Sequence, residues 1–372
     1  MKTLSLFESW LTCPYEEQDR WLEKHQTELN LAFLWEMKQY AAQNLVSAYQ
    51  LATAITKDMF RIAQRMAHEP LATPLAHWSQ GNCLTYVDLQ RAAESYLEAL
   101  RGYRSQNQPN EILSLLANLL YVATEVDLGL ARSAYQEICE LTDQSLEIDY
   151  PIQLRLKQNT AIFFYRLGEY DNALDANQTS LAISQDHHDI SRVAEILGNR
   201  GLYLGSAGRF NECEVYLIDG LTLAQHTDNQ ITVARTEMNL GELYTILGKP
   251  REALLRFANA RSQFLRLNNS MEMSSVVLRE ARLLERIGSL SQARRAYVDA
   301  AKHFLELQMW TQVWQATIEG AIANRRYGTF SEAAKLLSNA ERLWQSQKQP
   351  AWQIEWLLES AALAIAQAHF DR

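Results

Sequence analysis

The chain has 372 residues, of which 47% are hydrophobic, and its formal net charge is −9 at pH 7. The charged residues do not gather in large blocks, so we expect no direct binding of nucleic acid. No apolar run approaches the roughly 18 residues that a membrane-spanning helix needs, so no contact with a membrane is expected. With only 14 glycines and 7 prolines, the composition argues against disorder or long linkers.

The N-terminus and the cysteines indicate a compartment. Residues 1–14 have one lysine and a short apolar run interrupted by Glu8, without a small-residue cleavage site, so a signal peptide is not expected. The four cysteines lie far apart and form no CxxC pair. A reduced, cytoplasmic protein is the simplest interpretation.

Residues 15–30 predict an amphipathic helix with acidic residues in its first turn, and residues 29–66 add two or three further helical segments. These segments do not fit the repeat described next. We therefore predict that residues 1–74 form a helical cap region at the N-terminal end of an array.

The rest of the chain repeats with a period of 40 residues, marked by five glycines in similar sequence frames. Five residues after each glycine comes an alanine or a cysteine, and seven residues before it comes an alanine or a glycine. A glycine just past a helix can adopt the left-handed conformation that ends the helix, and small residues let two helices approach closely. The glycines are Gly168, Gly208, Gly248, Gly288 and Gly328.

The clearest copy is the stretch 231–264, which predicts two helices joined by a tight turn at Gly248. Gly241 and Ala253 are the small residues where the helices would cross, and Phe257 lies on the apolar stripe between them. Earlier copies are looser. Gly129 is followed five residues later by an alanine, and Asp88 stands where a turn glycine is expected.

These small, aromatic and glycine positions resemble those of the tetratricopeptide repeat family. The resemblance implies an all-α fold, a right-handed α-solenoid of helical hairpins over residues 75–372. The 40-residue period exceeds the family's usual length of about 34 residues. We interpret the difference as roughly one extra helical turn, shared between helices and loops.

The C-terminal segment, residues 351–367, matches the first helix of another hairpin, and the sequence stops before a second helix. We therefore expect an incomplete last hairpin and a chain that is the N-terminal part of a longer protein. Five tryptophans gather near this end. Their helical spacing favours packing between repeats, and a docking surface is the alternative. They are Trp310, Trp314, Trp344, Trp352 and Trp356.

No motif predicts catalysis, a metal site or a cofactor. The glycines of residues 201–208 lack the GxGxxG spacing and follow no strand. His187 and His188 lie between aspartates, but we interpret them as a solvated loop because no distal ligand is evident. Cys83 lies six residues after His77, but we interpret Cys83 as a packing residue on the first helix of a hairpin. The chain itself is thus predicted not to be an enzyme.

Three asparagines provide the main polar signal. Asn159, Asn199 and Asn239 each precede a turn glycine by nine residues, so they occupy the same place on successive first helices. Such a column can hold the backbone of an extended peptide, a use that the tetratricopeptide resemblance also implies. The alternative is that these amides bond neighbouring helices or merely solvate the groove. With the arginines of the same face, the predicted peptide-binding groove comprises Asn159, Asn199, Asn239, Arg155, Arg235 and Arg279.

Residues 5–140 resemble the start of bacterial tetratricopeptide proteins that carry a C-terminal CHAT domain, a caspase-like module. This resemblance implies a scaffold or sensor array that regulates such a domain in the same polypeptide and binds a peptide or protein partner. The sensor array of a bacterial transcriptional or signal-transduction regulator is the alternative.

Overall fold

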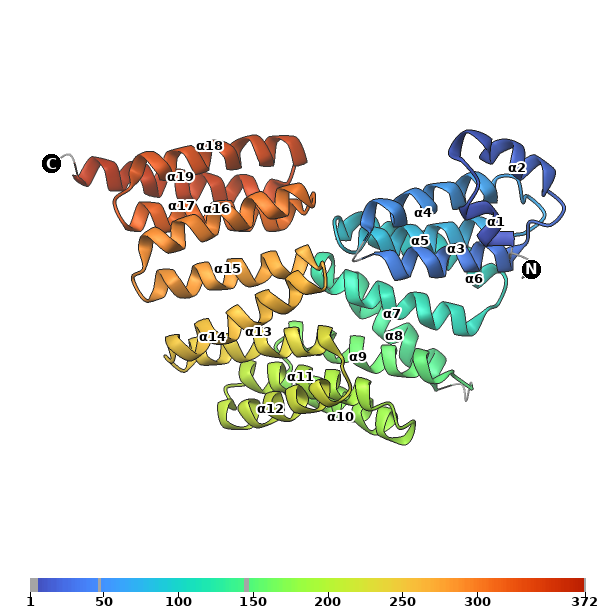
Figure 1. Ribbon diagram of the computed structural model, residues 1–372, viewed down its shortest axis with the longest axis horizontal. Coiled ribbons are helices and arrows are strands. Elements are labelled where there is room, and N and C mark those ends of the chain that lie inside the picture. Colours follow the sequence, from blue (N-terminus) through green and yellow to red (C-terminus); the bar gives the residue numbers. More distant parts are fainter. Residues whose placement is uncertain (1–5, 46–47, 144–146, 371–372) are drawn as a thin grey trace. The chain divides into compact units, whose positions relative to one another are not determined.

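The computed structural model describes residues 6–45, 48–143 and 147–370, and every regular element within these ranges is a helix (Figure 1). The chain divides into two compact units, residues 1–187 and 188–372. We call them unit 1 and unit 2.

Unit 1 begins with short helices and then forms hairpins. Its elements are α1 (Leu6–Leu11), η1 (Tyr15–Glu17), α2 (Gln18–Lys24), α3 (Leu31–Asn44), α4 (Tyr49–Ala63), α5 (Ala72–Leu84), α6 (Leu89–Ser105), α7 (Pro109–Val126), α8 (Leu128–Thr142), α9 (Tyr150–Arg166) and α10 (Tyr170–Asp186).

Unit 2 consists of regular hairpins followed by one long helix. Its elements are α11 (Ile190–Ser206), α12 (Phe210–His226), α13 (Gln230–Ile246), α14 (Pro250–Arg266), α15 (Ser270–Arg286), α16 (Leu290–Glu306), α17 (Trp310–Arg326), α18 (Phe330–Gln347) and α19 (Pro350–Phe370).

The 40-residue period is built from two helices of 17 residues and two turns of three residues, as in α13 and α14. Because the turns are already this short, the residues beyond the family's usual period lie in the helices. Our expectation that loops share the extra length is wrong in this respect. Longer helices give each hairpin a longer face to bury against its neighbours.

Both turns of each 40-residue repeat from α9 onward contain a left-handed residue. The five repeat glycines have φ between 69° and 77°, which confirms their predicted role as helix terminators. The second turn of each complete repeat uses residues other than glycine, with φ between 52° and 57°: His188, Asp228, Asn268, Gln308 and Lys348. His188 is therefore a turn residue, and Asp189 caps the next helix by accepting a hydrogen bond from the Arg192 amide.

Small residues hold the two helices of a hairpin together. A β-carbon on Gly241 would lie 2.5 Å from the ring of Phe257. The two helices can therefore pack this closely only because Gly241 has no side chain. Ala253 and Phe257 are buried beside this contact. The predicted crossing of α13 and α14 is thus confirmed.

The hairpins of unit 1 are less regular. Asp127 alone connects α7 to α8 and caps α8 by accepting hydrogen bonds from the amides of Gly129 and Leu130. Gly129 therefore lies within α8, and its interpretation as a turn glycine is wrong. Asp88 caps α6 through the Arg91 amide. Helices α3 and α4 pack on each other and on α5, while a boundary near residue 74 stays a prediction.

The C-terminal helix α19 packs on α17 and α18 through aromatic rings. Trp314 stacks on Trp352 with ring centroids 5.0 Å apart, and Trp344 lies 6.2 Å from Trp356. These contacts support the packing interpretation of the tryptophans. The helix ends at Phe370, and residues 371–372 lie outside the described ranges.

Gly248 and Gly241 of the same hairpin stabilise the fold for two different reasons, a positive φ at Gly248 and a close helix approach at Gly241. We expect Gly248→Ala to cost about 1 kcal/mol, because an L-residue is strained at positive φ, and Gly248→Asn to cost less. Gly241→Ala should cost about 1–3 kcal/mol through its clash with Phe257. Thermal unfolding followed by circular dichroism would measure both.

The additional substitution Phe257→Leu should recover part of the loss in Gly241→Ala and none of the loss in Gly248→Ala. Equal recovery in both backgrounds would show that the close helix approach is not the cause.

Candidate functional site

A pocket of about 280 Å³ lies within unit 1, on the face formed by the first helices α5, α7 and α9. We call it the asparagine pocket. Three asparagines line it, one from each of these helices, together with hydroxyl, arginine and leucine side chains. The lining residues are Leu45, Asn82, Thr85, Tyr86, Tyr96, Asn118, Tyr121, Arg155 and Asn159.

Hydrogen bonds hold the three amides in place. Oδ1 of Asn82 accepts from Nδ2 of Asn118 at 3.3 Å and from the Tyr96 hydroxyl at 3.0 Å. Nδ2 of Asn159 donates to the carbonyl of Ala117 at 2.8 Å. Thr85 also lies within hydrogen-bond distance of the Tyr96 hydroxyl. Each amide is thus oriented by a neighbouring helix. For Asn159, this is the structural role that the sequence analysis gave as the alternative to peptide binding.

Each amide uses only one of its two ends in these bonds. Within the described residues, three amide atoms have no protein partner: Nδ2 of Asn82, Oδ1 of Asn118 and Oδ1 of Asn159. One donor and two acceptors are the groups that pair with the C=O and N–H groups of a peptide backbone. The pocket therefore combines fixed amides with unused hydrogen-bonding capacity.

The remaining lining groups add charge and aromatic surface. Arg155 is exposed and lies one helical turn before Asn159 on α9. Tyr121 is 39% exposed, so its ring offers a surface against which an apolar side chain can pack. Burial raises the pKa of Tyr96 above its usual value, which keeps its hydroxyl protonated as the donor to Asn82.

A lysine lies beside the pocket against two indole rings. Nζ of Lys38 on α3 is 3.9 Å from the ring centroid of Trp78 and 4.6 Å from that of Trp35. Trp78 precedes Asn82 by one turn of α5. Burial, and then the positive charge of Arg155, lower the pKa of Lys38 to about 7. Lys38 and Arg155 therefore experience each other's charge.

Of the six residues predicted from sequence, only Arg155 and Asn159 line the pocket. Asn199 and Asn239 lie half-buried on α11 and α13 of unit 2, where neither side chain hydrogen-bonds to the described residues. Arg235 pairs with Glu272 at 2.9 Å, and Arg279 forms a close ion pair with Glu242. A peptide-binding role for these four residues stays a prediction.

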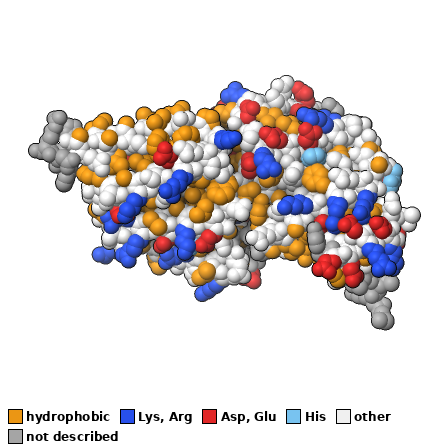
Figure 2. Space-filling model, turned by 90° about the horizontal axis from the view of Figure 1, so that it is seen from above, with side chains coloured by type: hydrophobic (Ala, Val, Ile, Leu, Met, Phe, Trp, Pro, Cys, Tyr) orange, Lys and Arg blue, Asp and Glu red, His pale blue; other side chains and the backbone are white. Residues whose placement is uncertain are grey.

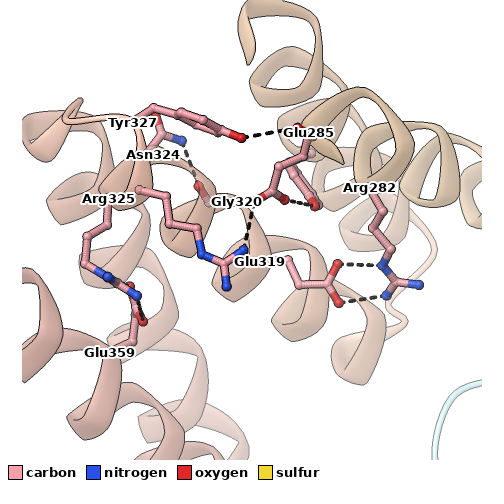
Figure 3. Close-up of polar contacts among 10 residues, drawn as sticks. Arg282, Glu285, Glu319, Gly320, Asn324, Arg325, Tyr327 and Glu359 are labelled. Carbon is pink, nitrogen blue, oxygen red and sulfur yellow. Dashed lines mark hydrogen bonds and ion pairs between the residues drawn. The ribbon is translucent and has the colours of Figure 1, made fainter. Parts of the chain in front are cut away.

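Ion pairs connect successive first helices along unit 2. Arg282 of α15 forms two hydrogen bonds of 2.7 Å to Glu319 of α17, and Arg325 of α17 binds Glu359 of α19 (Figure 3). Glu285 accepts a hydrogen bond from the buried Tyr297 hydroxyl at 2.8 Å. Much of the charge on these helices is therefore neutralised between neighbouring repeats.

On the face of the molecule drawn in Figure 2, acidic and basic side chains lie interspersed. Within the described ranges, no helix is both long and apolar enough to cross a bilayer. No cluster of three or more histidine, cysteine or acidic side chains is placed to hold a metal among these residues. Burial raises the pKa of Cys83, and that of Cys213 to about 11, opposite to the shift that activates a nucleophilic thiol.

Sequence reasoning missed Asn82 and Asn118. Asn82 precedes Asn118 by 36 residues, and Asn118 precedes Asn159 by 41 residues, whereas the search used a constant period of 40. A search that allowed the repeat length to vary would have found an asparagine on each of α5, α7 and α9.

The repeated hairpins define the class of protein: the chain is an α-solenoid of tetratricopeptide-like helical hairpins. No protein-family model matches it, and no curated protein sequence matches it. Its fold is similar to that of a Rap protein complexed with the Competence and Sporulation Factor, with TM-score 0.54, 14% identity, and 90% of this chain and 99% of that chain covered.

Two further solved structures are similar. NprR in complex with its cognate peptide NprX has TM-score 0.51 and 16% identity, covering 81% of this chain and 93% of that chain. A signal transduction ATPase with a tetratricopeptide repeat sensor from Pyrococcus horikoshii has TM-score 0.52 and 14% identity, covering 96% of this chain and 55% of that chain. At these identities, the likeness shows the fold alone.

The coupling between Lys38 and Arg155 can be measured. We expect Arg155→Gln to raise the pKa of Lys38, because loss of the neighbouring positive charge makes the protonated amine less unfavourable. NMR titration of the protein with ¹³C-methylated lysines would report the change. Arg101→Gln, at an exposed arginine paired with Glu98, is the control and should leave the pKa of Lys38 unchanged. A pKa that Arg155→Gln leaves in place would contradict the coupling.

Proposed function

We propose that this chain is a regulatory scaffold that binds an extended peptide in the asparagine pocket. The observation that carries the proposal is that Asn82, Asn118 and Asn159 are each fixed at one end, while the other end has no partner among the described residues. Amides held in this way can bond a peptide backbone regardless of its side chains.

The size of the pocket and the similar structures support the same function. A volume of about 280 Å³ suits a few peptide residues rather than a folded domain. Two proteins of similar fold have been crystallised with a peptide or factor, namely the Rap protein with the Competence and Sporulation Factor and NprR with NprX. Binding, rather than catalysis, is the role that we propose for this chain.

The predicted residues of unit 2 define a second location for the same function. Asn199 and Asn239 lie on adjacent first helices and keep their amides available, so a partner could contact them there. Arg235 and Arg279 would have to leave Glu272 and Glu242 before binding an acidic ligand. This cost makes unit 1 the preferred location.

Selection from a random peptide library displayed on phage, followed by calorimetry with the recovered peptides, would test the proposal. We expect Asn118→Leu with Asn159→Leu to weaken binding about tenfold, since each lost hydrogen bond is worth about 0.5–1.5 kcal/mol. Asn199→Leu with Asn239→Leu is the matched control in unit 2 and should leave the affinity unchanged.

Recovery of no specific peptide would overturn the proposed function. A loss confined to the unit 2 variant would move the site to the groove of unit 2. Circular dichroism spectra of both double variants would show that the helices are retained.

We further propose, from the resemblance of residues 5–140, that in a bacterial cytoplasm this array regulates a CHAT domain of the same polypeptide, with residues 1–74 as its cap. The alternative is the sensor of a signal-transduction or transcriptional regulator, which the likeness to a sensor-bearing ATPase favours. We expect the reading frame beyond Arg372 to encode histidine and cysteine on strand ends. A stop codon there would contradict both the CHAT-domain hypothesis and the sensor alternative. A helix-turn-helix there would support the sensor alternative.

A further inference from the structure

One face of α19 exposes a continuous row of apolar side chains. Its four large members are between 51% and 69% exposed. Their spacing by three, four and seven residues places them along one side of the helix, together with exposed alanines. We call this surface the α19 stripe. It consists of Ile354, Leu357, Leu358, Ala361, Ile365 and Ala368.

The equivalent positions of the other first helices are buried. On α17, 40 residues before the first four members of the stripe, each side chain is at most 6% exposed: Trp314, Thr317, Ile318 and Ala321. Helices α13 and α15 bury the same positions. In these hairpins a second helix, α14, α16 or α18, packs on the first. The α19 stripe is therefore an interface of the repeat that the described residues leave uncovered.

The second helices that cover this interface share a short pattern. A small residue is followed four residues later by a large apolar side chain, and three residues after that by another small residue. In α14 these residues are Ala253, Phe257 and Ala260, all of them buried. The pattern recurs in α12, α16 and α18, where it begins at Cys213, Ala293 and Ala333.

The α19 stripe contains the same pattern. Ala361, Ile365 and Ala368 follow one another with the same spacing of four and three residues. Ala361 also occupies the first-helix position at which α13 has Gly241. One exposed face thus presents both the small residue that receives a large side chain and a large side chain that can be received. An isologous interface between two copies requires such self-complementarity.

Contacts within a hairpin indicate how two such faces would meet. A β-carbon on Gly201 of α11 would lie 2.5 Å from the Leu217 side chain of α12. One on Gly220 of α12 would lie 3.1 Å from the backbone of Gly198. The small residue of the first helix therefore meets the large residue of the second helix, and the position three residues earlier meets the second small residue.

The same pairing can be made reciprocally by two antiparallel α19 helices. It would place Ile365 of each copy on Ala361 of the other, and Leu358 of each copy on Ala368 of the other. Every one of these pairs combines a large side chain with an alanine, so the two helices can approach closely.

Charge does not oppose this pairing. The acidic residues of α19 are Glu355 and Glu359, and both are engaged within their own copy. Glu355 accepts a hydrogen bond from Nε1 of Trp314 at 2.7 Å, and Glu359 pairs with Arg325. The stripe itself has no charged member, so no like charges would meet across the interface.

We propose that a second copy of this chain covers the α19 stripe, as an antiparallel helix pair about a two-fold axis near Ala364. The proposal is independent of the peptide-binding function, which lies in unit 1. One pair of helices buries less surface than the roughly 1,200 Å² of a standard stable interface, so we expect a dimer that dissociates at micromolar concentrations.

Sedimentation velocity of the 372-residue chain, over a range of micromolar concentrations, tests the proposal. We expect a monomer–dimer equilibrium. Leu358→Arg and Ile365→Arg should each weaken the dimer about tenfold or more, because each would bury an unpaired charge in the interface. The matched control is Leu255→Arg, at a side chain of α14 that is 61% exposed, and it should leave the dimer unchanged. Circular dichroism would show that all three variants keep their helices.

Disulfide cross-linking tests the arrangement of the two helices. Oxidation should link two copies of the Ala364→Cys chain, because the two-fold axis brings this position close to itself. Gln353→Cys, also exposed on α19, should stay unlinked, since an antiparallel pair separates its two copies by ~30 Å. The unsubstituted chain sets the background.

A chain that is monomeric at every concentration would overturn the proposal. So would a dimer that Leu358→Arg and Ile365→Arg leave intact, because the contact would then lie on another surface. Cross-linking of both cysteine variants would show that the α19 helices meet in parallel, and the antiparallel pairing would be wrong.

Discussion

The regular repeats from α9 to α18 depend on helices that stop after 17 residues, or 18 in α18. Two left-handed turn residues per repeat achieve this, one at a glycine such as Gly248 and one at a residue such as Asn268. Each turn reverses the chain in three residues, so consecutive helices must pack antiparallel. Since the helices have equal length, the same face of every first helix points the same way within its unit.

The sequence predicted the first of these turns but not the second. Glycine at positive φ leaves a visible mark, because other L-residues are disfavoured there. The second turn is occupied by His188, Gln308 and Lys348 as readily as by Asp228 and Asn268. These five positions hold five different residue types, so no single residue type reveals the left-handed conformation. The hairpins could therefore be predicted from sequence, and the distribution of length between helices and loops could not.

The candidate site was predicted only in part, for a related reason. Asn159 was found because the repeats that follow it have a constant length, whereas Asn82 and Asn118 belong to hairpins of unequal length. Comparing equivalent positions of successive repeats considers one residue per repeat. Such a comparison does not predict that Arg235 pairs with Glu272, 37 residues further along the chain. Partners on neighbouring repeats, rather than the residues themselves, decide which groove charges remain available.

The same physics explains why the pocket of unit 1 suits recognition. An asparagine that must be reoriented on binding loses side-chain entropy, and this loss offsets much of the hydrogen bond it gains. In the pocket, Asn118 is already fixed by Asn82, and Asn159 by the carbonyl of Ala117. Folding has therefore ordered these amides before any ligand arrives. An amide that is satisfied at one end and open at the other stabilises the array and presents a preorganised acceptor, so a single residue type serves both the fold and the site.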